Sequence, residues 1–233
     1  MAALLQTTGL TAFYGDYQAL DGIDFEVGPG EVVGVIGANG AGKTTLLRTI
    51  AGLLTCPNEA VRFEGRAIGG RAAHLVVALG IALVPEGRRL FPSLSVEENL
   101  QVGAYTRRAG RWNVQHVYEL FPVLGQRRHT RATQLSGGQQ QMVAIGRALM
   151  SNPTLLLCDE ISLGLAPLVI KDIYAALQTL TGEGLAAIIV EQDVALAQRT
   201  AARLYCLQEG RVSLAGSAST LTRENIAKAY FGV

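Results

Sequence analysis

The chain has 233 residues, of which 49% are hydrophobic and 17% are charged, and its formal net charge is +1. This composition is typical of a water-soluble globular protein, and the near-zero charge excludes a global attraction to nucleic acid or anionic lipid, so we expect no nucleic-acid partner. The longest apolar run, Leu75–Val84, is about half as long as a membrane-spanning helix must be. The N-terminus lacks the charged and apolar segments of a signal peptide. We therefore expect a cytoplasmic protein that serves a membrane, if at all, from the aqueous side.

The cysteines and histidines are scattered along the chain, at Cys56, Cys158 and Cys206 and at His74, His116 and His129. This spacing predicts reduced thiols and no metal site built from these residue types. Basic residues gather at residues 107–111 and 127–131. We favour a solvated face of a polar lobe for both clusters, with a contact surface as the alternative.

The sequence pattern of the first part of the chain predicts several strands and one glycine-rich loop between the third strand and a helix. The predicted strands are Leu4–Tyr14, Gln18–Val27, Val32–Ile36, Ala60–Phe63 and Gly80–Val84. A helix is predicted directly after the loop, from Thr45, and a second one over Arg71–Leu79.

The middle of the chain, residues 95–134, has no long apolar strand. Helical patterns such as Val114, Val117 and Phe121 stand there among basic residues. We predict a helical lobe inserted between two parts of an α/β core, residues 1–94 and 135–233.

The α/β pattern returns after the lobe. A helix is predicted over Gly137–Met150, followed by strands at Leu155–Cys158 and Ala186–Val190. Continuous apolar runs of this kind are expected of parallel strands that are covered on both faces. Such an open sheet carries its site at the carboxyl ends of the strands.

The motif with the clearest chemistry is the loop between the third strand and its helix. Its sequence, Gly37-Ala38-Asn39-Gly40-Ala41-Gly42-Lys43-Thr44, fits G-x-x-x-x-G-K-[ST] and is followed by Thr45. Glycines let consecutive backbone N–H groups surround a phosphate at the positive end of a helix. Lys43 can then reach the β- and γ-phosphates, and the Thr44 hydroxyl can bind Mg²⁺. The loop predicts a site for a nucleoside triphosphate and Mg²⁺.

Two carboxylates follow the apolar strand at Leu155–Cys158. Asp159 suits a Mg²⁺ shell, and Glu160 can polarise an attacking water. An acidic pair after a strand is weak evidence alone, but it becomes strong beside the loop at Gly37–Thr44.

A third motif, Leu135-Ser136-Gly137-Gly138-Gln139, opens the helix before that strand. Ser136 can cap the helix, and the two glycines leave its N–H groups open to an anion. With this motif the chain resembles the ATP-binding-cassette (ABC) family of ATPases, whose signature is L-S-G-G-Q. The resemblance covers the whole chain, residues 1–233. It implies one domain with a P-loop α/β core, an N-terminal antiparallel β subdomain and an inserted helical lobe that ends at the signature.

The resemblance also implies a role for individual residues. Ser136, Gly137, Gly138 and Gln139 would complete the nucleotide site of a second cassette in a head-to-tail dimer. Asp159 would bind Mg²⁺, Glu160 would be the catalytic base, and Tyr14 would stack on adenine. An edge-strand tyrosine without that role is the alternative for Tyr14, and Phe13 and Tyr17 are the other candidates.

Three positions depart from the family pattern. Glu86 stands where the family usually has a Gln that senses Mg²⁺ and the transmembrane partner, and its carboxylate can still bind Mg²⁺. Gln192 stands where a His usually bonds the γ-phosphate, and an amide can donate that bond without carrying a proton. Ile161 replaces the Pro that usually follows the catalytic Glu, and we expect no loss of chemistry from this change.

These departures resemble the smaller ATPase of bacterial branched-chain amino-acid importers. The ATPases of urea or short-amide importers and of lipopolysaccharide exporters are alternatives, although the first usually keeps Gln at position 86 and the second His at position 192. The resemblance implies a second cassette, identical or paralogous, separate permease subunits and, indirectly, a periplasmic binding protein. The cassette would lie on the inner face of the cell membrane.

Two other function classes are less well supported by the sequence. A soluble cassette acting on ribosomes, DNA repair or chromosome structure usually has two cassettes, a coiled-coil insertion or zinc-binding cysteines. A P-loop kinase or GTPase would leave Leu135–Gln139 unexplained.

Overall fold

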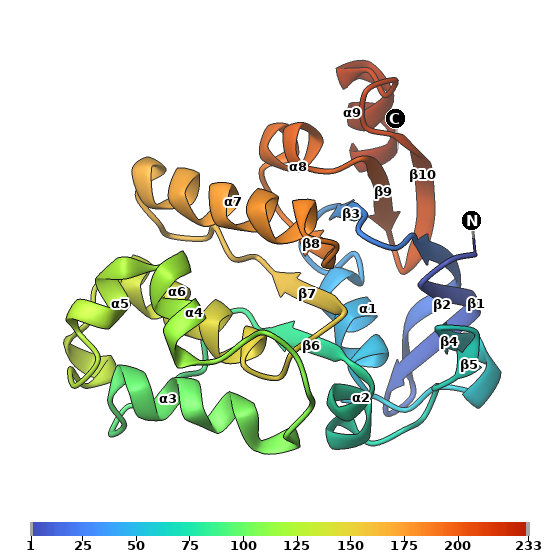
Figure 1. The fold of residues 1–233 in the computed structure, drawn as a ribbon. Coiled ribbons are helices and arrows are strands. Elements are labelled where there is room, and N and C mark those ends of the chain that lie inside the picture. Colours follow the sequence, from blue (N-terminus) through green and yellow to red (C-terminus); the bar gives the residue numbers. More distant parts are fainter. Residues whose placement is uncertain (1, 232–233) are drawn as a thin grey trace.

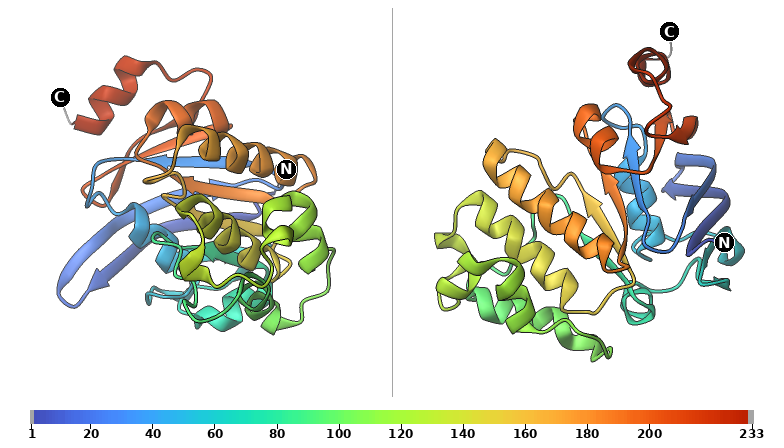
Figure 2. Two further views of the ribbon diagram at one scale, coloured as in Figure 1. Left: turned by 90° about the vertical axis from the view of Figure 1, so that its left-hand side faces the viewer. Right: turned by 45° about the horizontal axis from the view of Figure 1, so that its top comes forward.

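The N-terminal strands form an antiparallel sheet in the computed structural model, which describes residues 2–231. Strands β1 (Leu5–Tyr14) and β2 (Tyr17–Val27) make a long hairpin, and β1 also pairs with β4 (Val61–Phe63), which pairs with β5 (Arg66–Ala67). The hairpin tip lies at the edge of the molecule, and its strands curve away from the larger sheet (Figure 2).

The larger sheet has the order β10-β9-β3-β8-β7-β6 within the described residues. Its parallel part consists of β3 (Val32–Ile36), β6 (Ile81–Val84), β7 (Leu155–Asp159), β8 (Ala186–Val190) and β9 (Arg203–Gln208), while β10 (Arg211–Ser217) runs antiparallel to β9. Every residue of β7 and β8 is buried, as their continuous apolar sequences predicted.

Alternating side chains of these strands enter two separate cores, because successive side chains point to opposite faces of a sheet. Leu156, Cys158 and Ile189 belong to the core shared with the helices α6 (Gly137–Leu149), α7 (Pro167–Gly182), α8 (Val194–Thr200) and α9 (Arg223–Phe231). Leu157 and Ile188 belong to the other core, shared with α1 (Lys43–Ile50), α2 (Ala73–Leu79) and the antiparallel sheet. Figure 1 shows the parallel strands between these two groups of elements.

The lobe at residues 95–134 is helical. It contains α3 (Val96–Val102), α4 (Val114–Leu120), α5 (Pro122–Gln126) and 3₁₀ turns at Gly103–Thr106 and Ala132–Gln134. A side chain at Gly146 of α6 would come within 2.7 Å of Val117 and 2.8 Å of Leu100, so these helices pack closely against α6. Helix α6, which begins at the signature, thus packs against the helices of the lobe as well as against the larger sheet. The predicted boundary between lobe and core at residues 134 and 135 stays a prediction.

The differences from the predicted elements are small before residue 193. The second predicted helix begins at Ala73 rather than Arg71, and the signature helix ends at Leu149 with Met150 as its C-cap. Helix ends are the least certain part of any assignment, because their last bonds are shared with turns. The elements after Gln192, namely α8, β9, β10 and α9, have no counterpart among the predicted ones. Among residues 2–231, no helix is both long enough and apolar enough to cross a bilayer.

Candidate functional site

Residues of the glycine-rich loop meet Glu86, Glu160 and Gln192 in one cavity of about 430 Å³ at the carboxyl ends of the parallel strands. Its walls come from the hairpin tip, the loop before α1, and the segments that follow β6, β7 and β8. They are Tyr14, Tyr17, Ala19, Asn39, Gly40, Gly42, Lys43, Thr44, Thr45, Glu86, Glu160 and Gln192. Of the aromatic candidates at the hairpin tip, Tyr14 and Tyr17 line the cavity, and Phe13 is not among the lining residues. Tyr14 and Tyr17 are also direct partners in the antiparallel register.

At two positions of the loop before α1, a side chain would both strain the backbone and collide with a neighbour. Gly37 has φ 147°, and a Cβ there would lie 2.2 Å from the carbonyl oxygen of Leu207. Gly42 has φ 103°, and a Cβ there would lie 2.8 Å from the Leu20 side chain. Helix α1 then begins without a side-chain cap on its N-terminal N–H groups. These groups are free for an anion, as the sequence motif predicted.

Lys43 is the cation of the cavity. Its Nζ donates hydrogen bonds to the carbonyl oxygens of Gly37 at 2.7 Å and Ala38 at 2.9 Å. Burial lowers the pKa of its ammonium group, and the negative charges of Glu160 and Asp159 oppose that effect. The ammonium therefore lies between the loop and two carboxylates, the place from which it can meet a phosphate.

Asp159 ends β7 and joins it to the loop helix. Its Oδ1 accepts a hydrogen bond of 3.0 Å from Thr44 Oγ1. Burial raises the pKa of this carboxyl to about 6, against the lowering effect of the Thr44 bond, and the charges of Glu160 and Glu86 add to the increase. A cation bound here would relieve that accumulation of negative charge.

Glu160 and Gln192 lie in the segments that follow the neighbouring strands β7 and β8. Gln192 Nε2 donates a 2.6 Å hydrogen bond to Glu160 Oε2. Glu160 has φ 47°, in the left-handed region that non-glycine residues rarely occupy, and its N–H donates to the carbonyl of Val190. Such strain persists only where the surrounding structure imposes it, and it is frequent at functional sites.

The signature residues are placed apart from this cavity. Ser136 is exposed and caps α6, where its Oγ accepts from Gln139 N and the Gln139 side chain accepts from Ser136 N. Gly138 is required by packing, because a Cβ there would lie 2.5 Å from Val169 of α7. Gly137 faces Arg88, whose Nη2 would be 3.1 Å from its Cβ. None of Ser136–Gln139 is among the residues that line the cavity.

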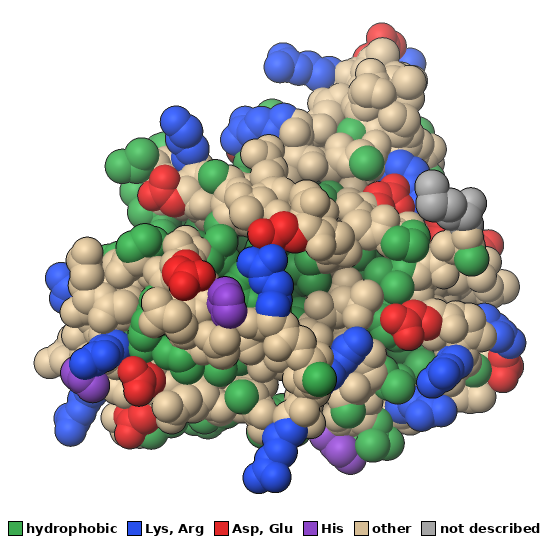
Figure 3. Space-filling view, in the orientation of Figure 1, with side chains coloured by type: hydrophobic (Ala, Val, Ile, Leu, Met, Phe, Trp, Pro, Cys, Tyr) green, Lys and Arg blue, Asp and Glu red, His purple; other side chains and the backbone are tan. Residues whose placement is uncertain are grey.

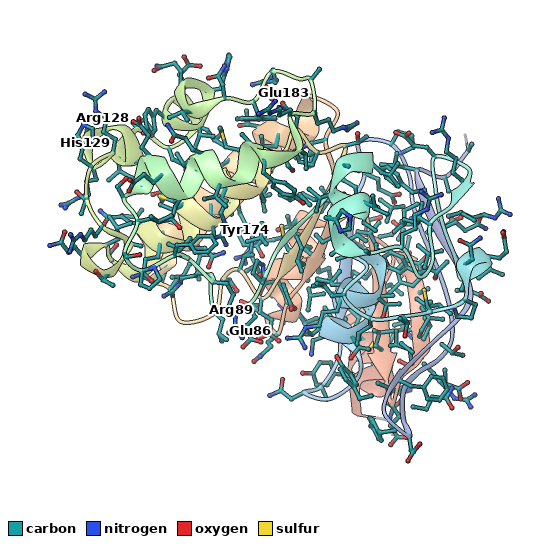
Figure 4. The ribbon with its side chains drawn as sticks, turned by 90° about the horizontal axis from the view of Figure 1, so that it is seen from below. Glu86, Arg89, Arg128, His129, Tyr174 and Glu183 are labelled. Carbon is teal, nitrogen blue, oxygen red and sulfur yellow. The ribbon has the colours of Figure 1, made fainter. Side chains whose placement is uncertain are left out.

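The loop between β6 and the lobe connects the cavity with α6. Glu86 is exposed and lies beside Arg89 in this loop (Figure 4). Arg147 of α6 donates to the carbonyl oxygens of Arg89 at 2.8 Å and Arg88 at 3.0 Å. Helix α6 is therefore bonded directly to the loop that carries Glu86.

The two basic clusters lie away from the cavity. Arg111 forms a 2.7 Å ion pair with Glu183, and Arg108 donates to Thr154 Oγ1 at 3.0 Å. Arg128 and His129 are exposed at the outer end of the lobe, away from Glu86 (Figure 4). On the face drawn in Figure 3, basic and acidic side chains are interspersed. These features favour the solvated-face interpretation.

A larger groove of about 640 Å³ lies between α8 and α9 and has a mainly apolar lining that includes Val194, Ala195 and Ile226. It contains no motif residue and no carboxylate. We therefore place the nucleotide site in the smaller cavity, which has the loop, the cation and the acidic groups.

Comparison with known proteins shows the family of the chain. The sequence profile of the family described as ABC transporter matches residues 20–162. The chain is 44% identical over 232 residues to the high-affinity branched-chain amino acid transport ATP-binding protein BraG of Pseudomonas aeruginosa, with 98% of this chain and 100% of that protein covered. It is 32% identical to the probable branched-chain amino acid transport ATP-binding protein LivF of Archaeoglobus fulgidus, with 99% of each covered.

Solved structures show the same fold. The ADP conformation of an ATP-binding cassette of an ABC transporter is similar with a TM-score of 0.85 and 26% identity over 100% of both chains. A dimeric bacterial ABC transporter cassette is similar with a TM-score of 0.81 and 25% identity, covering 92% of this chain and 98% of that one. The predicted fold class is confirmed, and the chain belongs to the ABC transporter family as one of its ATP-binding cassettes, an ATPase.

Proposed function

We propose that this cassette hydrolyses ATP to energise the import of branched-chain amino acids through separate transmembrane subunits. The observation that carries the hydrolytic part is the meeting of Lys43, Glu160 and Gln192 in one cavity. The substrate class is supported by the full-length similarity to BraG, a branched-chain amino acid transport protein. Glu86 and Gln192, two of the three departures from the family pattern, favour this class over urea importers and lipopolysaccharide exporters.

Each side chain in the cavity suits one part of the reaction. Tyr14 and Tyr17 offer aromatic faces for the base, and the glycine-rich loop with Lys43 holds the phosphates. Glu160 accepts a proton from the attacking water, whose oxygen bonds to the γ-phosphorus while the bond from that phosphorus to the bridging oxygen breaks. Gln192 holds the Glu160 carboxylate through its amide N–H and can donate to a phosphate oxygen with the same group.

The oxygen groups around Thr44 fit a magnesium ion. Thr44 Oγ1 and Asp159 Oδ1 are 3.0 Å apart, and Glu86 lines the same cavity. Hydroxyl and carboxylate oxygens are the ligands that Mg²⁺ prefers. We infer that Thr44, Asp159 and Glu86 hold it, directly or through water. When bound, the ion supplies positive charge that neutralises the phosphate oxygens.

Two surfaces suit the proposed partners. The signature at Ser136–Gln139, which begins at the exposed Ser136, suits the nucleotide of a second cassette, identical or paralogous. The loop after Glu86 suits a permease, because Phe91 is 46% exposed and the cavity beside it, about 190 Å³, is lined by Arg88, Arg89 and Leu90 among others. The cassette would then lie on the inner face of the membrane, with a periplasmic binding protein contributing only through the permeases.

Uptake by cells tests the substrate class. Deletion of the gene should abolish high-affinity uptake of labelled leucine, isoleucine and valine, and wild-type protein should restore it while Lys43→Ala does not. Labelled urea is the control substrate. Unchanged leucine uptake together with lost urea uptake would assign the cassette to the urea class instead.

A further inference from the structure

A buried carboxylate at Glu191 has no role in the reaction described above. Glu191 directly follows β8 and is 1% exposed. Its Oε2 accepts a 2.5 Å hydrogen bond from Ser162 Oγ, and its Oε1 accepts from Tyr174 OH at 2.5 Å and from Ser162 N at 3.3 Å. Burying a carboxylate is costly unless hydrogen bonds compensate, and here three donors converge on one group.

These contacts close a ring that includes the proposed catalytic pair. Gln192 bonds to Glu160 through its side chain, and Glu160 leads through Ile161 to Ser162. Ser162 bonds to Glu191, which is the chain neighbour of Gln192. Two side-chain hydrogen bonds therefore join the segments that follow β7 and β8. One is the bond from Gln192 to Glu160 in the cavity, and the other is the bond from Ser162 to the buried Glu191.

The bond from Ser162 to Glu191 is important because the segment from Glu160 is strained. Glu160 has φ 47°, and Ile161, which has no ring to fix its φ, follows it. Glu160 N donates to the carbonyl oxygen of Val190, and the carbonyl oxygen of Glu160 accepts from Leu163 N. The Ile161 side chain is 1% exposed, so the segment is held at Glu160 and Ile161 only by these backbone bonds, the Gln192 contact and packing. The Glu191 carboxylate supplies the polar anchor at the next residue, and Tyr174 of α7 fixes the carboxylate in turn.

We propose that Glu191 is a positioning residue for ATP hydrolysis, holding Ser162 so that the Glu160 carboxylate and the Gln192 amide keep their 2.6 Å contact. The proposal rests on the proposed role of Glu160. It requires the hydrogen-bonding capacity of Glu191 rather than its charge. A glutamine can accept from Ser162 N and Tyr174 with its oxygen and donate to Ser162 Oγ with its nitrogen.

The experiment compares Glu191→Leu with Glu191→Gln in the full-length cassette reconstituted with its permeases. Leucine fills the site without polar atoms, so we expect kcat to fall about 10- to 100-fold, the cost of a misplaced reacting group. The Kd for ATP should stay within about threefold of the wild-type value, and Glu191→Gln should keep kcat within about threefold. Asp172→Asn, an exposed carboxylate on the same helix as Tyr174, is the matched control and should change neither.

If Glu191 had only a structural role, the effects on kcat and on the Kd for ATP would be different. Such a role predicts loss of ATP binding in proportion to lost folding stability. Should Glu191→Leu fail to fold, Ser162→Ala removes the same contact from the loop and should lower kcat with the same unchanged Kd. Wild-type kcat in Glu191→Leu or in Ser162→Ala would overturn the proposal, as would an equal loss in Glu191→Gln and Glu191→Leu.

The Glu160→Gln background separates this proposal from the function on which it rests. If Glu191 acts through Glu160, Glu191→Leu should cause no further loss of the residual kcat in that background, because the two effects share one group. A loss by the same factor as in wild type would overturn the positioning role alone. Wild-type kcat in Glu160→Gln itself would overturn the proposed base, and with it the route from Glu191 to the reaction.

Discussion

Gln192 and Glu160 are joined by a 2.6 Å hydrogen bond between the segments that follow the neighbouring parallel strands β8 and β7. Both side chains line the cavity that also holds Lys43. Because the amide N–H group is a donor and the carboxylate is an acceptor, the contact fixes the carboxylate without taking its proton-accepting role.

Loss of Lys43 should weaken nucleotide binding most. Lys43→Ala removes the cation beside the glycine-rich loop, so the Kd for MgATP, measured by calorimetry, should rise at least about 100-fold, the scale for a lost charge-assisted contact. Arg89→Ala, which removes an exposed cation from the neighbouring loop, is the control and should leave Kd nearly unchanged. Equal affinities of wild type and Lys43→Ala would contradict the assignment of the loop.

The exposed Ser136 of the signature predicts an effect on the pairing of two cassettes rather than on ATP binding. Ser136→Arg should leave ATP binding by the isolated chain intact, because Ser136 lies outside the chain's own cavity. It should abolish ATP-dependent pairing, measured by light scattering, and hydrolysis by the assembled transporter, since a bulky side chain blocks the opposing phosphate. Loss of ATP binding by the isolated monomer would place the signature in its own site instead.

Arg203 and Glu31 should stabilise the junction of the two sheets. Arg203 bonds to both Glu31 oxygens, at 2.6 and 2.9 Å, and to Glu26. Burial raises the pKa of Glu31, but the bonds from Arg203 and Gly28 and the Arg203 charge outweigh it and bring the pKa below its usual value of 4.5. We expect Glu31→Gln to lower the free energy of unfolding by about 1–3 kcal/mol at neutral pH, measured with urea.

The stabilisation by Glu31 should depend on pH. A carboxyl whose pKa is lower in the folded state stabilises the protein above its unfolded pKa, and that contribution is lost as pH falls through the folded pKa. The difference between wild type and Glu31→Gln should therefore be constant near neutrality and shrink below about pH 4.5. Glu59→Gln, from an exposed ion pair, should show little difference at any pH.

Gln192 replaces an imidazole by a group that does not titrate, and this has consequences for the pH profile. Gln192→His should remain active, because both side chains can donate to a phosphate oxygen, and its kcat can gain an acidic limb near the usual histidine pKa of about 6.5. Gln192→Ala should be strongly impaired. The measurement is kcat against pH for the reconstituted transporter. Hydrolysis by Gln192→Ala at the wild-type rate would show that the Gln192 side chain has no role in the reaction.

The sequence predicted the parts of the fold that have local signals. The runs Leu155–Cys158 and Ala186–Val190 carry five or fewer apolar residues each, yet both predicted fully buried strands, because both faces of a parallel sheet are covered. The loop at Gly37–Thr44 was recognisable because its glycines are required by local backbone geometry. Motif residues carry their chemistry at fixed spacing, so they could be named without the fold.

What could not be predicted depends on neighbours in space. The order β3-β8-β7 decides that Gln192 reaches Glu160, and no local pattern reveals strand order. From sequence alone, a Glu that follows a strand is usually expected to be exposed. Glu191 is buried because Ser162 and Tyr174 lie against it and bond to its carboxylate. The hairpin of β9 and β10 did have a signal, the apolar run Leu204–Leu207 followed by Glu209–Gly210, whose φ values of 48° and 75° suit a tight hairpin turn.

The base assignment of Glu160 is tested most directly by Glu160→Gln in the reconstituted transporter. The change keeps the size of the side chain and removes its capacity to accept a proton, so the Kd for ATP should stay near the wild-type value while kcat falls by roughly 10²–10⁴. Glu183→Gln, a surface carboxylate at the C-cap of α7, is the control and should keep both values. A wild-type kcat in Glu160→Gln, with nucleotide binding unchanged, would contradict the proposal that the carboxylate held by Gln192 activates the attacking water.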